Sequence, residues 1–210
     1  MRKLLTEFIG TFFLVLTIGL TVTSGSQFAP IAIGTSLMIM VYMGGHVSGG
    51  HYNPAVSLAA LMRGALPSKD FIPYVVSQVA GAIVAALMVN VVTGQTFAPA
   101  PAATASTLGA LLVEILYTFA LALVVLNTAT SKKTEGNSYY GLAIGMTVMA
   151  AAFAGGGISG GAFNPAVGLG PTIVNVILGG GSWAALWLYL VGPFLGGAMA
   201  AMVFKIQDTE

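Results

Sequence analysis

The chain is short of two things that soluble proteins depend on, cysteine and charge. It contains no cysteine, which excludes disulfide bonds and thiolate metal sites. Only 6% of its 210 residues are charged and 57% are hydrophobic, whereas an ordinary soluble domain is about 25% charged. Because a water-exposed fold needs a charged exterior, this composition predicts a protein embedded in lipid.

The positions of the few charges divide the chain into membrane spans. No Asp, Glu, Lys or Arg lies between Phe8 and Met62, or between Gly136 and Phe204. Since a span needs roughly 20 apolar residues, each of these runs must hold several helices. Apolar segments and chain breakers predict six spans, near 4–23, 31–46, 71–92, 108–128, 139–155 and 184–204. Two shorter apolar segments, 54–62 and 165–174, are too short to cross a bilayer.

The basic residues predict how these spans are oriented. With six spans and a cytoplasmic N-terminus, every Lys and Arg falls on the cytoplasmic side, and the outer connections 24–30, 93–107 and 156–183 carry no charge. Basic residues favour the cytoplasmic side of membrane proteins, so both termini are expected there, in a plasma (inner) membrane. Aromatic residues near the span ends are expected at the lipid–water interface: Tyr74, Tyr139, Tyr140 and Trp183. A net charge of +1 gives no reason to expect nucleic acid as a partner.

The chain also contains an internal repeat. The segment Ser48–Leu58 recurs as Ser159–Leu169 with eight of eleven residues identical, 111 positions later. The repeat halves, about 4–93 and 108–205, each contain three spans. An odd number of spans forces the second half to insert upside down. We therefore expect a single transmembrane domain, residues 1–210, in which the two copies of Asn-Pro-Ala enter from opposite sides and meet near mid-membrane.

The repeated motif predicts the start of a helix inside the membrane. Asn is a favoured N-cap and Pro a favoured first helical residue, so Asn53-Pro54-Ala55 and Asn164-Pro165-Ala166 should each begin a re-entrant half-helix. Irregular backbone at membrane depth is tolerated when it lines a wet cavity. The two amides and the carbonyls of the Gly-rich segments 45–52 and 155–163 are expected to bind passing neutral molecules, while the positive half-helix ends oppose cations.

From residues 4 to 205 the chain resembles the aquaporins, the major intrinsic protein family. The resemblance rests on Gly45–Val56, Ser159–Val167, Gln78-Val-Ala-Gly81 and Val191-Gly-Pro-Phe194. It implies an all-α membrane fold of six transmembrane helices and two half-helices, assembled as a homotetramer with one pore in each subunit. It also implies a selectivity filter on the outer side, formed here by Ile33, Ala152, Gly161 and Val167.

This filter departs from the common family pattern. Most members have Arg directly after the second Asn-Pro-Ala, where this chain has Val167. Glycerol-conducting relatives place Asp next, where Gly168 stands. All four filter residues lack side-chain hydrogen-bonding groups, so the filter is expected to be wide and apolar. Water is the first expected solute. The alternative is a facilitator mainly for ammonia, urea, glycerol or hydrogen peroxide.

Four other polar residues are expected to brace the re-entrant loops: Glu7, Glu114, His46 and His51. Glu7-x-x-x-Thr11 and Glu114-x-x-x-Thr118 occupy matching places in the two halves, and each Thr is expected to be a partner of its Glu. An acid inside a span also suggests a proton relay, which keeps a proton-coupled secondary transporter as the alternative from another class. No catalytic residues, metal site or cofactor are expected, since no nucleophile, base and acid converge in the sequence.

Overall fold

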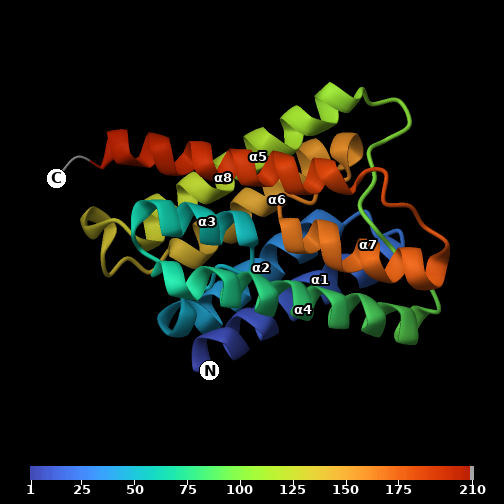
Figure 1. Cartoon of the computed structure of the whole chain (residues 1–210), viewed down its shortest axis with the longest axis horizontal. Helices are drawn as coiled ribbons and strands as arrows, with labels where there is room; N and C mark the ends of the chain where they lie inside the picture. The colour runs from blue at the N-terminus through green and yellow to red at the C-terminus, as the bar shows by residue number, and fades with distance from the viewer. Residues whose placement is uncertain (209–210) are drawn as a thin grey trace.

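Six long helices dominate the structure, a computed structural model that describes residues 1–208 (Figure 1). Each is long and apolar enough to cross a membrane. They are α1 (Arg2–Thr23), α2 (Ala29–Ser48), α4 (Ser68–Thr93), α5 (Thr107–Ala129), α6 (Tyr140–Ser159) and α8 (Leu186–Gln207). Within the described residues no strand occurs. The prediction of an all-α membrane fold with six spans is confirmed.

Two short helices complete the fold, α3 (Pro54–Arg63) and α7 (Pro165–Gly179). They lie end to end along the long axis, α3 toward the end of the molecule that holds both chain termini and α7 toward the other (Figure 1). We call these ends the terminal pole and the far pole. The α5–α6 connection, with the short 3₁₀ helix η1 (Lys132–Thr134), lies at the terminal pole, and the α4–α5 connection lies at the far pole (Figure 1).

Glycine allows the long helices to approach closely, and it does so at matching places in the two halves. In the first half α1 packs against α4, and in the second α5 packs against α8. A Cβ added to Gly81 of α4 would lie 2.5 Å from the carbonyl oxygen of Phe8 in α1, and one added to Gly196 would meet the carbonyl oxygen of Ile115 in α5. These backbone-to-backbone contacts fix the helix pairs between which α3 and α7 are inserted.

The helices before the two motifs are longer than the sequence predicted. We expected them to end near 46 and 155, but α2 continues to Ser48 and α6 to Ser159. Glycine alone does not stop them; each ends where the next glycine, Gly49 or Gly160, adopts the left-handed conformation with φ near +90°. The non-helical backbone before each Asn is therefore confined to 49–52 and 160–163, which is shorter than the Gly-rich segments 45–52 and 155–163 that the sequence predicted.

Replacing Gly81 by Ala is expected to destabilise the protein. The new methyl group would press on the backbone of α1, and overpacking of this kind costs about 1–3 kcal/mol, more than the roughly 1 kcal/mol that Ala gains over Gly in a helix. Thermal unfolding in detergent measures the effect. The matched control is Gly157→Ala in α6, where a Cβ meets nothing within 4 Å; that variant should be at least as stable as the wild type. Equal melting temperatures for both variants would contradict the close packing of α1 and α4.

Candidate functional site

The N-terminal ends of α3 and α7 meet at the centre of the molecule. Asn53 caps α3, its Oδ1 accepting from the backbone N–H of Ala55 at 2.9 Å. Asn164 caps α7 in the same way, accepting from Ala166 at 2.9 Å. Because Pro follows each Asn at the first helical position, where no N–H is needed, the sequence Asn-Pro-Ala specifies both the start and the direction of each half-helix.

The two caps are joined by a reciprocal pair of hydrogen bonds. Nδ2 of Asn53 donates to the carbonyl oxygen of Phe163 at 2.8 Å, and Nδ2 of Asn164 donates to that of Tyr52 at 2.9 Å. An amide NH₂ group has two hydrogens, so each Asn keeps one for another acceptor. Both side chains line a cavity. The centre of the molecule therefore presents two fixed hydrogen-bond donors to whatever occupies that cavity.

The residue before each Asn holds a strained backbone conformation. Tyr52 and Phe163 have φ of +49° and +48°, a region that bulky side chains avoid. Such a conformation costs about 1–3 kcal/mol and persists only where the surroundings enforce it. The enforcing group is a buried carboxylate in each half: Glu7 accepts from the N–H of Tyr52, and Glu114 from that of Phe163, both at 2.7 Å.

Glu7 holds the first loop through four donors. Its Oε1 accepts from Ser48 Oγ at 2.6 Å and from the N–H of His51 at 3.0 Å. Its Oε2 accepts from the N–H of Tyr52 and from Gln78 Nε2, both at 2.7 Å. Both acids are fully buried, and hydrogen bonds are what make a buried carboxylate tolerable.

Glu114 repeats this arrangement with three donors, Ser159 Oγ, Ala162 N–H and Phe163 N–H. The expected Thr partners take no part. Thr11 and Thr118 are buried, but neither hydroxyl has a hydrogen-bond partner within residues 1–208. The repeated Thr residues therefore reflect the internal repeat of the sequence and do not brace the loops.

Among the described residues, the loop of the first half has a polar network that the second half lacks. His51 Nδ1 lies 3.0 Å from Ser57 Oγ, and Gln78 Nε2 donates to the same Oγ at 3.0 Å. The second repeat has Ala162 and Gly168 at the positions of His51 and Ser57. The side chain of His51 thus links the first loop to α3, whereas His46 is exposed and, in the part of the chain that the structure describes, makes no hydrogen bond to the loop.

Two tyrosines that the sequence did not single out as loop supports have this role as well. Tyr74 Oη donates to the carbonyl oxygen of Ser48 at 2.8 Å, and Tyr189 Oη donates to that of Ser159. Tyr74 was expected at the lipid interface but is 1% exposed, so that prediction was wrong. The sequence signal was available, since Tyr74–Gly81 and Tyr189–Gly196 begin and end with the same residues.

A cavity of about 400 Å³ is lined by the two Asn caps at one end and by Phe97–Ala100 of the α4–α5 connection, so it extends toward the far pole. All four positions that the resemblance assigned to a filter line it, Ile33 and Ala152 from the long helices, Gly161 from the second loop and Val167 from α7. Most of the remaining lining is aliphatic, with Leu14, Ile18, Leu37, Leu121, Val125, Ile144 and Val148 among it. The described residues that line this cavity include no charged side chain.

A second cavity, of about 590 Å³, opens at the terminal pole between the end of α2 and the α5–α6 connection. Its lining includes Gly45 and Gly49, and the first cavity is lined by their repeat equivalents, Gly156 and Gly160. The two cavities thus occupy equivalent places in the inverted halves, one on each side of the Asn-Pro-Ala centre.

Comparison with known proteins decides the family. A sequence model described as Major intrinsic protein matches residues 1–204. This chain belongs to the major intrinsic protein family. It is 33% identical to a maize protein named Aquaporin NIP1-1, over 98% of this chain and 74% of that protein. It is 34% identical to Glycerol uptake facilitator protein-like 6 of Lactiplantibacillus plantarum, over the full length of both chains.

The fold of this major intrinsic protein matches that of a solved relative. An X-ray structure of the aquaglyceroporin from Plasmodium falciparum superposes with a TM-score of 0.87 at 24% identity, covering 97% of this chain and 95% of that one. As a member of this family, the protein is a membrane channel and not an enzyme. No cluster of His, Cys, Asp or Glu that could hold a metal ion occurs within the described residues.

Proposed function

We propose that the chain is a passive channel for water and other small neutral solutes, with Asn53 and Asn164 binding the solute at mid-membrane. The two cavities form its vestibules, and Ile33, Ala152, Gly161 and Val167 form its filter. We place the terminal pole in the cytoplasm, because every Lys and Arg falls on that side of the six spans. We further propose a plasma (inner) membrane location and a homotetramer of single-domain subunits.

One observation supports this proposal above all others: two amide donors face an otherwise largely apolar cavity that has no charged side chain among its described lining residues. A neutral molecule that accepts hydrogen bonds gains these donors in place of lost water. A cation gains no hydrogen bond from these donors, and it also meets the positive ends of α3 and α7, each equivalent to roughly half a charge. The site therefore favours neutral, hydrogen-bonding solutes.

The filter residues favour a broad range of such solutes. Val167 and Ile33 are aliphatic, and Ala152 and Gly161 are small, so none narrows the cavity with a polar or aromatic side chain. Urea, glycerol, ammonia and hydrogen peroxide are candidates beside water. The relative from Lactiplantibacillus plantarum is named for glycerol uptake, which agrees with a filter that admits more than water.

A proton-coupled transporter fits the geometry less well. Coupling needs an ionisable group that exchanges protons with the pathway. Glu7 and Glu114 are fully buried, neither lines the two cavities, and their oxygens are occupied by loop donors. His51 is the ionisable residue among the described lining of the central cavity, and its Nδ1 is engaged with Ser57 Oγ at 3.0 Å. Stopped-flow measurements on proteoliposomes test the channel proposal: flux should be linear in solute concentration and unaffected by a proton gradient. Saturation together with a requirement for that gradient would overturn it.

Because the chain has no cysteine, single cysteines can report which residues line the pore. Val167→Cys is expected to make water flux sensitive to a mercurial, since a bulky adduct at a cavity-lining position blocks the lumen. The wild type should be resistant. The measurement is osmotic water permeability before and after the reagent, with recovery on adding a thiol.

The control variant for this test is Val91→Cys on α4. Val91 is 76% exposed on the outside of the helix bundle, so its adduct lies away from the cavity and should leave the flux unchanged. Inhibition at both positions would indicate an effect on the whole protein. Resistance at Val167, with labelling confirmed by mass, would remove this residue from the proposed filter.

A further inference from the structure

The two amides at the centre of the pathway can satisfy one oxygen atom of a solute. Asn53 and Asn164 each use one Nδ2 hydrogen on the carbonyl oxygen of the opposite loop. Each amide oxygen is engaged in capping its own half-helix. One hydrogen then remains on each amide, and two hydrogens match the two lone pairs of a single hydroxyl or carbonyl oxygen. The centre therefore suits a solute with one oxygen as its polar head.

The second loop, which lines the same cavity, can offer only hydrogen-bond acceptors to a solute. The N–H groups of Ala162 and Phe163 donate to Glu114. The N–H of Gly161 donates to Ser159 Oγ at 3.1 Å. The carbonyl oxygens of Gly161 and Ala162 accept no hydrogen bond from the described residues, and both residues line the cavity. A solute N–H or O–H can therefore find a partner on this loop, whereas a solute oxygen cannot.

The rest of the proposed filter presents aliphatic surface. Ile33 and Ala152 have aliphatic side chains, and their backbone N–H groups lie inside α2 and α6. Val167 is in the first turn of α7, where the N–H groups point toward the N-terminus of the helix, that is, toward the Asn centre. A polar group of the solute that reaches neither the second loop nor the two amides therefore loses water without gaining a partner, which is unfavourable.

We propose that the pore selects solutes with one hydrogen-bonding head on a short apolar body, and that it discriminates against polyols of the same width. Acetamide is the model solute. In the filter its NH₂ group donates to the carbonyl oxygen of Gly161, while its methyl group lies against Ile33 and Val167. At the centre its oxygen accepts from both Asn amides. Glycerol has three hydroxyl groups, which the pathway cannot satisfy together. This inference rests on the channel function proposed above.

The test compares two pairs of solutes of nearly equal size, in which one member lacks a polar group. Acetamide has a methyl group where urea has NH₂, and 1,3-propanediol lacks the middle hydroxyl of glycerol. Stopped-flow light scattering measures uptake into proteoliposomes, and uptake by empty liposomes is subtracted. The remaining channel flux should be about fivefold or more higher for the less polar member of each pair, because an unpaired buried polar group is worth at least that factor. A wide water-filled pore would pass both members equally.

Three variants separate selection by polarity from selection by width. Val167→Thr keeps the shape of the side chain and adds a hydroxyl group to the filter, so glycerol flux should rise about threefold while that of 1,3-propanediol changes less. Val167→Ala widens the filter without adding a polar group, so both fluxes should rise and their ratio should stay the same. Val91→Thr makes the isosteric change on the outside of α4, where Val91 is 76% exposed, and should leave both fluxes unchanged.

The outcomes distinguish this inference from the proposed channel function. If the wild type passes water and the two members of either pair pass equally, or the more polar member passes faster, the channel stands and selection by polarity is overturned. A flux ratio that falls in Val167→Ala and not in Val167→Thr overturns it as well, because the filter then selects by width. If neither water nor any of the four solutes passes faster than through empty liposomes, the channel function itself is overturned, and this inference with it.

Discussion

Glu7→Gln is expected to collapse the first re-entrant loop and to remove most of the water flux. The wild-type carboxylate accepts on both oxygens from donors that surround it. In the variant one of these atoms becomes an NH₂ group. Ser48 and Gln78 can adapt by rotating, and Gln78 Oε1, which has no hydrogen-bond partner within residues 1–208, can accept. The backbone N–H groups of His51 and Tyr52 cannot rotate, so one of them loses its acceptor in either orientation.

The size of this effect follows from burial and strain. A buried donor left without a partner costs about 1–3 kcal/mol. The lost acceptor also no longer enforces the left-handed conformation near Tyr52, whose carbonyl oxygen accepts the hydrogen bond from Asn164. Since every 1.4 kcal/mol is a tenfold change in population, we expect water permeability per protein to fall about tenfold or more. Thermal unfolding and stopped-flow light scattering on the same preparation measure both quantities.

Stability and water flux are compared in the same variants. A brace predicts that both fall together, and that Glu114→Gln, which disturbs three donors in place of four, has the same or a smaller effect. Asp70→Asn makes the same chemical change to an acid in the first turn of α4 and should alter neither the melting temperature nor the water flux. A Glu7→Gln protein with wild-type stability and no flux would instead favour the proton-coupled transporter, with Glu7 as its proton carrier.

The architecture was predictable from the sequence because a lipid environment permits few backbone structures. A chain with 6% charged residues must bury its backbone polar groups in helices, so the charge gaps and apolar runs were enough to find six spans and two half-helices. Boundaries were harder to predict. The ends of α2 and α6 depend on which glycine in a run adopts positive φ, and Gly44 and Gly45 stay helical while Gly49 does not.

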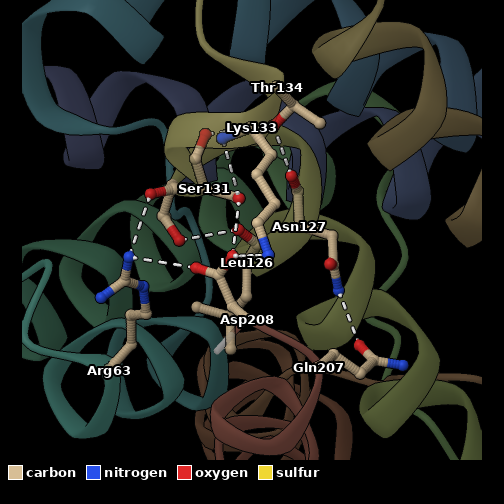
Figure 2. Close-up of polar contacts among 9 residues, drawn as sticks. Arg63, Leu126, Asn127, Ser131, Lys133, Thr134, Gln207 and Asp208 are labelled. Carbon is tan, nitrogen blue, oxygen red and sulfur yellow. Dashed lines mark hydrogen bonds and ion pairs between the residues drawn. The ribbon is translucent and has the colours of Figure 1, made fainter. Parts of the chain in front are cut away.

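At the candidate site the sequence predicted that the two Asn caps would meet, but it did not predict which atoms their side chains would bind. The duplicated Asn-Pro-Ala indicated that two caps would meet, but not that each Asn would donate to the other loop's backbone. That pairing depends on the positions of two carbonyl oxygens, Tyr52 and Phe163, which local sequence does not encode. Long-range partners decide the burial of Asp208 as well: its side chain is 9% exposed because it contacts Ser131 and Arg63, 77 and 145 positions away in the sequence (Figure 2).

Val167→Arg is expected to change the proposed filter from broad to narrow. Val167 lies in the first turn of α7 and lines the cavity with Ile33, Ala152 and Gly161. Arginine would place a long side chain with five N–H donors there and reduce a space of about 400 Å³. Glycerol and urea, which need the width, should lose about tenfold or more in flux, an added barrier of roughly 1.4 kcal/mol. Water, which is smaller and gains hydrogen-bond donors, should stay within about threefold.

Solute size and side-chain charge are separated by a second variant at the same position. Val167→Met adds length without charge, so it should reduce glycerol flux less than Val167→Arg does. It should also leave any passage of small cations unchanged, whereas the guanidinium of Val167→Arg should suppress cation passage. Val167 is 3% exposed and packs with Leu188 and Tyr189, so the melting temperatures of both variants accompany the flux data. Because a filter discriminates only where the pathway is narrow, equal fractional losses of water, urea and glycerol in a stable Val167→Arg protein would show that the constriction lies elsewhere. The Asn53–Asn164 centre would then be the position that selects the solute.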